Sequence, residues 1–195
     1  MIKVRKNCFE TNSSSTHALI ISNDDFCNWK IDKDIHEMSV FNLKDNISIF
    51  TGEADDTANN NMPYNVYEGT FTDVKDKLRY LYTVLVQSNL YINRNGNIIL
   101  NEDSDAYSIF KDLKELFPNV TFVVPENGYN YIFEDCEYLT EEILQSEYLT
   151  TLRGLVLFFL KGRIQYCDRD DSMELNDELH EEVKENSLCS VICSG

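Results

Sequence analysis

The chain has 195 residues, of which 43% are hydrophobic and 26% charged, and it contains only 7 Gly and 3 Pro. These proportions exclude a disordered chain and predict one domain, residues 1–195, with a buried core. The formal net charge is −17, and residues 99–195 carry most of it, with 21 acids against 7 bases. Because such a field repels phosphate backbones, we expect no direct nucleic-acid binding through the C-terminal half.

Two strands are expected near the N-terminus. Residues 2–9 form a short basic stretch with interleaved apolar side chains, and residues 18–22 form a compact apolar run. We expect these strands to pair antiparallel, joined by residues 10–17, and the second to lie in a sheet against the helices that follow. Residues 51–69 lack a sustained apolar period, which predicts a long mobile loop.

Two helices are predicted in the middle of the chain. The first covers residues 72–91, with a capping signal at Thr70 and Asp73 and an apolar stripe made by Val74, Leu78, Leu81 and Leu85. The second is capped by Ser104 and ends at Pro118. Its apolar face consists of Ala106, Ile109, Phe110, Leu113, Leu116 and Phe117.

The rest of the chain predicts a buried strand at 119–124 and three further helices. One helix starts at Thr140, one covers 149–164 and is apolar nearly all round, and an acidic one covers 173–186. The acidic C-terminal helix and tail together occupy about 172–195. Strands followed by helices indicate an α+β fold: a small, mainly antiparallel sheet packed against four to five helices, with an acidic helical C-terminal half.

Small hydroxyl and amide side chains crowd residues 9–22 ahead of a histidine. The candidates for nucleophilic catalysis are a serine, a histidine base and an orienting acid: Ser13, Ser14 or Ser15, His17 and Glu10. No nucleophile-elbow sequence frames them. Two other interpretations stay open: an anion-binding turn, and a polar turn whose hydroxyls bond to its own backbone.

Metal and cofactor motifs are not recognisable in the sequence. The cysteines and histidines lack paired zinc spacing, both around Cys8, His17, Cys27 and His36 and around His180, Cys189 and Cys193. The last two cysteines belong to what reads as a frayed tail. Asp168, Asp170 and Asp171 lack the calcium-loop pattern, and no Walker A or dinucleotide fingerprint occurs. We therefore expect no metal and no cofactor.

The N-terminus has no apolar signal region, and the longest apolar run, "LVLFFL", is too short to cross a bilayer. These features predict a cytoplasmic protein that contacts no membrane and keeps its thiols reduced.

The stretch "RKNCFETNSSSTHALII", Arg5 to Ile21, resembles the opening of a family of largely uncharacterised proteins in phages and prophages of Firmicutes. In that family a short basic strand leads into Phe-Glu-Thr-Asn-Ser-Ser-Ser and then a histidine. The resemblance implies a shared role for this motif, but it brings no activity with it. It also implies a phage protein acting in the host bacterial cell, where small acidic phage proteins often occupy basic, nucleic-acid-binding surfaces of defence machinery.

The leading hypothesis is therefore a non-enzymatic, phage-encoded inhibitor of a bacterial defence effector, of anti-CRISPR type. Acids of two blocks, 126–147 and 168–185, would dock on a Lys/Arg-lined channel of a nuclease. The carboxylates expected to bind this partner are Glu134, Asp135, Glu137, Glu141, Glu142, Asp168, Asp170, Asp171, Glu174, Asp177, Glu178, Glu181 and Glu182.

Two alternatives to this hypothesis remain open at the level of the sequence. The first is a hydrolase or transferase that uses the N-terminal motif. The second is a small-ligand sponge or sensor with a pocket beside that motif. A homodimer is compatible with each of these hypotheses, because aromatic side chains are enriched at interfaces.

Overall fold

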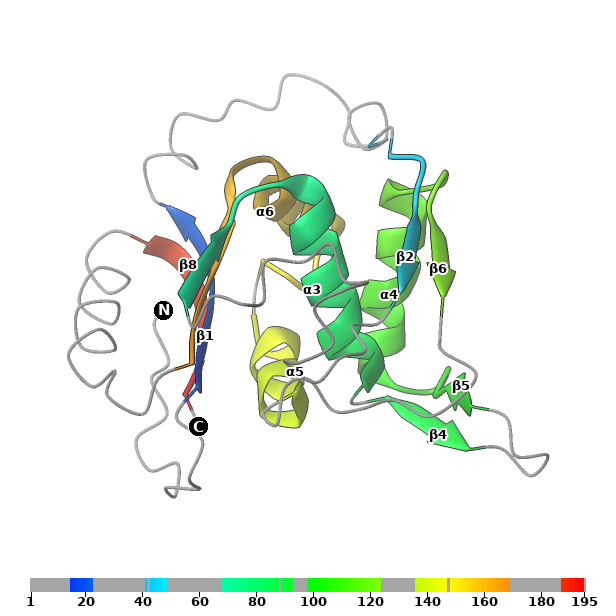
Figure 1. The fold of residues 1–195 in the computed structure, drawn as a ribbon. Coiled ribbons are helices and arrows are strands. Elements are labelled where there is room, and N and C mark those ends of the chain that lie inside the picture. The colour runs from blue at the N-terminus through cyan, green and yellow to red at the C-terminus, as the bar shows by residue number, and fades with distance from the viewer. Residues whose placement is uncertain are drawn as a thin grey trace.

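The computed structural model describes residues 15–22, 41, 43–48, 68–87, 89–92, 98–123, 136–146, 148–168 and 187–194. These residues form an α+β structure, in which a four-stranded antiparallel sheet is one layer and helices lie on one of its faces (Figure 1). Helices α3, α5 and α6 lie next to the sheet, and α4 lies beyond α3. The expected fold class is therefore confirmed as α+β, with four helices among the described residues.

The sheet has the strand order β3–β7–β1–β8, and each neighbouring pair is antiparallel. Its strands are β1 (Ser15–Ser22), β3 (Glu68–Phe71), β7 (Arg163–Asp168) and β8 (Ser187–Ser194). Phe71, Ile164 and Leu19 occupy one register row across three strands, and all three are buried in the core. Ile20 follows on the opposite face and is only 3% exposed, so both faces of the sheet are covered at β1.

The expected pairing of residues 2–9 with β1 is wrong. β7 pairs with residues 15–20 on one edge of β1, and β8 pairs with residues 16–22 on the other. Since a strand has only two edges, no position beside residues 16–20 remains for a third partner. Residues 2–9 themselves lie outside the described residues.

The C-terminal residues that read as a frayed tail form β8. β7 and β8 both run antiparallel to β1, so they run in the same direction as each other. Asp168, the end of β7, and Ser187, the start of β8, therefore lie at opposite ends of the sheet. The acidic residues between them lie outside the described residues.

Helix α3 (Val74–Gln87) is the central helix of the core. Its predicted stripe is only part of what it buries, because Tyr80 and Tyr82 are also fully buried. The cap is Asp73, whose Oδ1 accepts a hydrogen bond from the backbone N–H of Lys75. Thr70 belongs to β3, which also takes in the last residues of the expected loop 51–69; residues 51–67 lie outside the described residues.

Helix α4 (Asp105–Leu116) begins and ends as predicted. The Oγ atom of Ser104 accepts a hydrogen bond from the backbone N–H of Tyr107, and Phe117 is the C-cap. Every residue of the predicted apolar face is buried. The ring of Phe117 also packs edge-to-face on the ring of Phe159, at a centroid distance of 4.9 Å, which ties α4 to α6.

Helices α5 (Cys136–Leu144) and α6 (Leu152–Lys161) differ from expectation at their ends. Thr140 lies inside α5, where its hydroxyl donates to the carbonyl of Val84, so it joins α5 to α3 instead of starting a helix. Helix α6 buries most of its length, as predicted, but it is shorter than 149–164 because the chain enters β7 directly after Gly162. The acidic helix expected at 173–186 lies outside the described residues.

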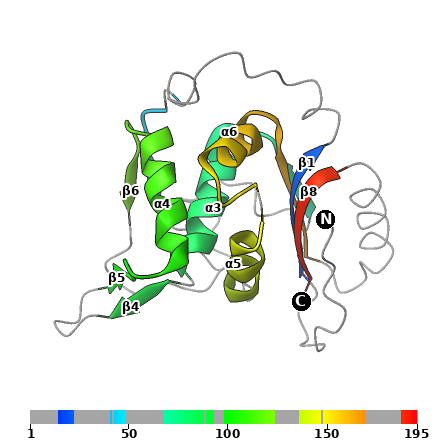
Figure 2. The same ribbon diagram turned by 180° about the vertical axis from the view of Figure 1, so that it is seen from behind.

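Two small sheets complete the described structure. Strands β4 (Leu90–Ile92) and β5 (Ile98–Leu100) are antiparallel, and β2 (Asn46–Ser48) and β6 (Thr121–Val123) are parallel. In Figure 2, α4 lies between β6 and α3. The expectation of a fully buried strand at 119–124 is wrong, because Thr121 and Val123 are exposed and only Phe122 is half-buried.

Candidate functional site

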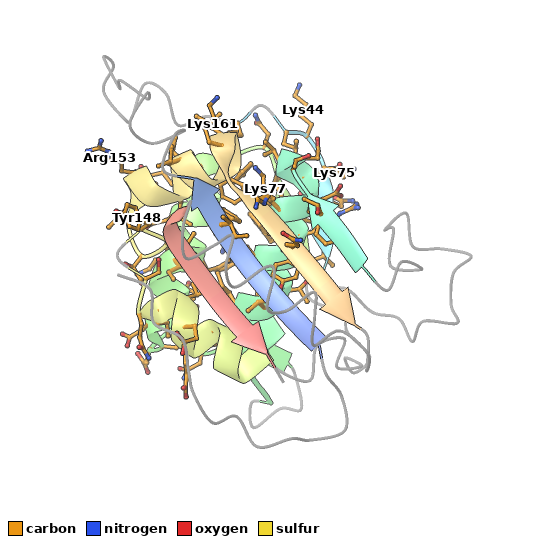
Figure 3. The ribbon with its side chains drawn as sticks, turned by 90° about the vertical axis from the view of Figure 1, so that its left-hand side faces the viewer. Lys44, Lys75, Lys77, Tyr148, Arg153 and Lys161 are labelled. Atoms are coloured by element: carbon orange, nitrogen blue, oxygen red, sulfur yellow. The ribbon has the colours of Figure 1, made fainter. Side chains whose placement is uncertain are left out.

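One end of the sheet brings the N-terminal motif next to the second acidic block. Ser15 starts β1 and lies opposite Asp168, which ends β7. Helix α5 lies at this same end of the molecule, while the other ends of β1 and β7 point away from it (Figure 3). We call this end, defined by Ser15, Asp168 and α5, the acidic end.

The serine–histidine stretch does not continue as a turn up to His17. Ser15, Thr16 and His17 are strand residues, and His17 lies opposite Tyr166 and Cys193. The sequence predicts these three residues in the connection at 10–17, because the apolar run begins only at Ala18. The other candidates, Glu10, Ser13 and Ser14, lie outside the described residues.

Four of the acids predicted to bind a partner belong to the described residues, and they lie in two elements. Glu137, Glu141 and Glu142 belong to α5, and Asp168 ends β7. The remaining predicted acids, Glu134, Asp135, Asp170, Asp171, Glu174, Asp177, Glu178, Glu181 and Glu182, lie outside the described residues. The structure thus places the start of the second acidic block and α5 toward the same end of the molecule, although α5 contacts β8, which β1 separates from β7.

Packing of α5 decides which of its side chains face outward. Thr140 and Ile143 are buried against the core, and the hydroxyl of Thr140 donates to the carbonyl of Val84 at 3.2 Å. Glu141 is exposed and Glu142 is partly exposed. Because residues three apart share a helix face, burying positions 140 and 143 turns Glu141 to the outside.

Basic side chains gather at the opposite end of the molecule, which we call the basic end. It carries Lys44, Lys75, Arg153 and Lys161 (Figure 3). The amino group of Lys75 pairs with the carboxylate of Asp45. The hydrogen bond that Lys75 donates to this carboxylate is the main reason that the pKa of Asp45 is lowered. Within the described residues, this end thus carries exposed cations together with the acids Asp45, Asp73 and Asp76, which lie near Lys75.

The sequence also gave no sign of a buried lysine in α3. Lys77 is 1% exposed, and its Nζ donates to the carbonyls of Phe158 (3.1 Å), Phe159 (2.7 Å) and Gly162 (2.8 Å). Burial lowers the pKa of Lys77 to about 8, while the charge of Asp73 opposes that shift.

The three acceptors of Lys77 are carbonyls at the C-terminal end of α6, where the helix dipole favours a cation. The carbonyl of Phe158 also accepts from the backbone N–H of Gly162 at 2.8 Å, so Lys77 adds a second donor there. An ammonium group has three N–H donors, and all three are used here. The arrangement therefore caps α6, and we assign Lys77 a structural role. Its position among apolar residues of a helical stripe conceals this role in the sequence.

Within the described ranges, no group of three or more His, Cys, Asp or Glu side chains is arranged to hold a metal ion. Cys189 and Cys193 lie in β8, at register positions opposite Ile21 and His17. None of the helices that the structure describes is long and apolar enough to span a membrane.

Comparisons with known proteins add no further assignment. No family model, curated protein or solved structure matches this chain.

Proposed function

We propose that the chain is a phage-encoded inhibitor of a bacterial defence effector, of anti-CRISPR type, that binds a basic, nucleic-acid-binding surface through its acidic end. Two features of the sequence support this proposal. The net charge is −17, concentrated in the C-terminal half, and the N-terminal motif resembles that of a phage family. Such a protein would compete with the phosphate backbone for lysine and arginine side chains.

The observation that carries the proposal is the position of α5 and Asp168 at one end of the molecule, with exposed basic side chains at the other end (Figure 3). The acidic end combines α5, with Glu141 exposed, and Asp168, where the second acidic block begins. The basic end carries Lys44 and Lys161, both exposed. A cationic partner surface attracts the first end and repels the second, so this charge distribution would orient the protein during encounter.

The test is a competition experiment with purified RNA-guided nuclease complexes and a labelled DNA target. We expect the protein to displace DNA, and its inhibition constant to rise steeply as salt is increased. The double variant Glu141→Lys/Glu142→Lys should inhibit at least about tenfold less well, because it reverses two charges at the acidic end.

The matched control is Asp103→Lys/Glu115→Lys, which changes the net charge by the same amount at two exposed positions outside α5 and β7. Asp103 lies just before α4, and Glu115 lies in the last turn of that helix. We expect this control to inhibit nearly as well as the native chain. Equal losses in both double variants would mean that only net charge matters. Inhibition that does not depend on salt would rule out competition with phosphate groups.

A further inference from the structure

A hollow of about 480 Å³ lies between α4 and β6. Its aromatic lining includes Tyr82, Phe110 and Phe122, whose rings contact one another at centroid distances of 5.7, 5.1 and 5.3 Å. Known binding pockets have volumes of roughly 300–1,000 Å³ and mostly apolar walls. The hollow therefore has the size and lining to accept a large apolar side chain.

β6 borders this hollow, and one of its two edges has no partner among the described strands. The backbone N–H of Thr121 donates to the carbonyl of Asp45 at 2.9 Å, on the side of β2. In a parallel pair, alternate residues of a strand bond to its neighbour, so the N–H and C=O of Phe122 point away from β2. Among the described strands, β6 pairs with β2 alone. Within the described part of the chain, the outer edge thus presents one donor and one acceptor, the N–H and C=O of Phe122, beside the aromatic lining.

Contacts with α3 and α4 fix the position of β6. The hydroxyl of Tyr82, on the central helix α3, donates to the carbonyl of Val123 at 3.1 Å. Phe122 packs its ring against both Tyr82 and Phe110. Because the ring of Phe122 and the carbonyl of Val123 are already held, β6 loses little conformational entropy when another strand pairs with it, and this favours binding.

Lys114 is the one charged residue in the described lining of the hollow. It is exposed, and its Nζ lies 4.4 Å from the centroid of the Phe110 ring. A cation at the rim of an apolar hollow favours a ligand with an apolar group next to an acidic one.

We propose that the groove between α4 and β6 binds an extended peptide segment of a partner protein, which adds to the open edge of β6. The peptide places an aromatic side chain in the hollow and a carboxylate near Lys114. Strand addition takes its affinity from main-chain hydrogen bonds and its specificity from pockets for alternate side chains. The open backbone groups of Phe122 favour a peptide over a small aromatic molecule, which has no repeating backbone to meet them. This site is separate from the acidic end and does not depend on the proposed function.

The test uses the full chain and a capped peptide, Thr-Val-Phe-Thr-Glu-Val-Thr, in which Phe and Glu project from the same face of a strand. Affinity is measured by calorimetry, and hydrogen exchange of the Phe122 amide is followed with and without peptide. We expect saturable binding and slower exchange at Phe122. Two further peptides are N-methylated, one at Phe and one at the following Thr. Since alternate amides of a strand point to the same side, one of these two peptides should bind at least about tenfold more weakly and the other nearly normally.

Charge specificity is tested with Lys114→Glu and with Lys111→Glu as its matched control. Lys111 is exposed on the same helix and lies over the Tyr107 ring, 5.3 Å from its centroid, outside the hollow's described lining. Lys114→Glu should reverse the preference between the Glu peptide and the same peptide with Lys, and Lys111→Glu should not. The proposal is overturned if no peptide binds, if both N-methylated peptides bind like the parent, or if acetyl-phenylalanine amide binds as tightly as the peptide.

Discussion

Lys77 on α3 donates a hydrogen bond from Nζ to the backbone carbonyl of Phe159 on α6, at a distance of 2.7 Å. The same ammonium group reaches the carbonyls of Phe158 and Gly162, and it lies 5.7 Å from the centroid of the Phe158 ring. This contact fastens the central helix to the point where α6 ends and β7 begins. It therefore links the helical layer to the strand beside β1.

Replacing Lys77 with methionine should destabilise the protein by about 2–4 kcal/mol, because carbonyls at the end of α6 lose a buried donor. Methionine keeps an unbranched apolar chain of similar length, so little cavity is expected. Urea unfolding of the two proteins measures the difference. Lys111→Met, an exposed substitution on α4, should change stability by less than about 0.5 kcal/mol. If Lys77→Met unfolded at the same urea concentration as the native protein, the three hydrogen bonds would make no net contribution to stability.

The pH dependence of stability should show the lowered pKa of Lys77. Burial lowers this pKa from 10.5 to about 8, so the folded chain holds the proton less tightly than the unfolded chain. Between these two values unfolding takes up a proton, and a rise in pH therefore increases stability. The native protein should gain stability relative to Lys77→Met between pH 8 and pH 10.5, a comparison that cancels the effects of other groups. A difference that stays flat or falls across this window would contradict the direction of the shift.

The cap of α4 should make a measurable contribution to stability. Ser104 Oγ accepts from the backbone N–H of Tyr107 at 3.2 Å. Ser104→Ala should cost about 1 kcal/mol in the free energy of unfolding, as other N-cap serines do. Ser108→Ala is the matched control, since Ser108 is exposed within the same helix and bonds only back to the carbonyl of Asp105. Thermal unfolding of the two variants should separate them, and equal melting temperatures would argue against the cap.

Alanine at Gly154 should destabilise α6, although alanine normally favours a helix by about 1 kcal/mol over glycine. A Cβ atom at this position would collide with the backbone carbonyl of Tyr148, which cannot rotate away as a side chain could. We expect a net loss of about 1–3 kcal/mol, typical of overpacking in a core. Leu160→Ala tests the same helix at an exposed position, where the loss should be below about 1 kcal/mol. A Gly154→Ala variant more stable than the native chain would mean that the backbone shifts without cost.

The sequence alone determined those elements whose signals are local. Ser104, the apolar spacing from Ala106 to Phe117 and Pro118 predicted the whole of α4 and its buried face, because capping and a 3.6-residue period act within a few turns. The apolar character of α6 predicted its burial in the same way.

Only the tertiary structure decided which strands lie beside β1. Its partners, β7 and β8, come from residues more than 140 positions later in the chain, and nothing within residues 15–22 specifies them. The position of Ser15 opposite Asp168, and hence the acidic end, follows from this pairing. Lys77 and Thr140 find their carbonyl acceptors on other helices in the same way. Hydrogen-bond partners distant in sequence are chosen when the layers pack, because a polar side chain enters a core only where the assembled fold supplies its partner.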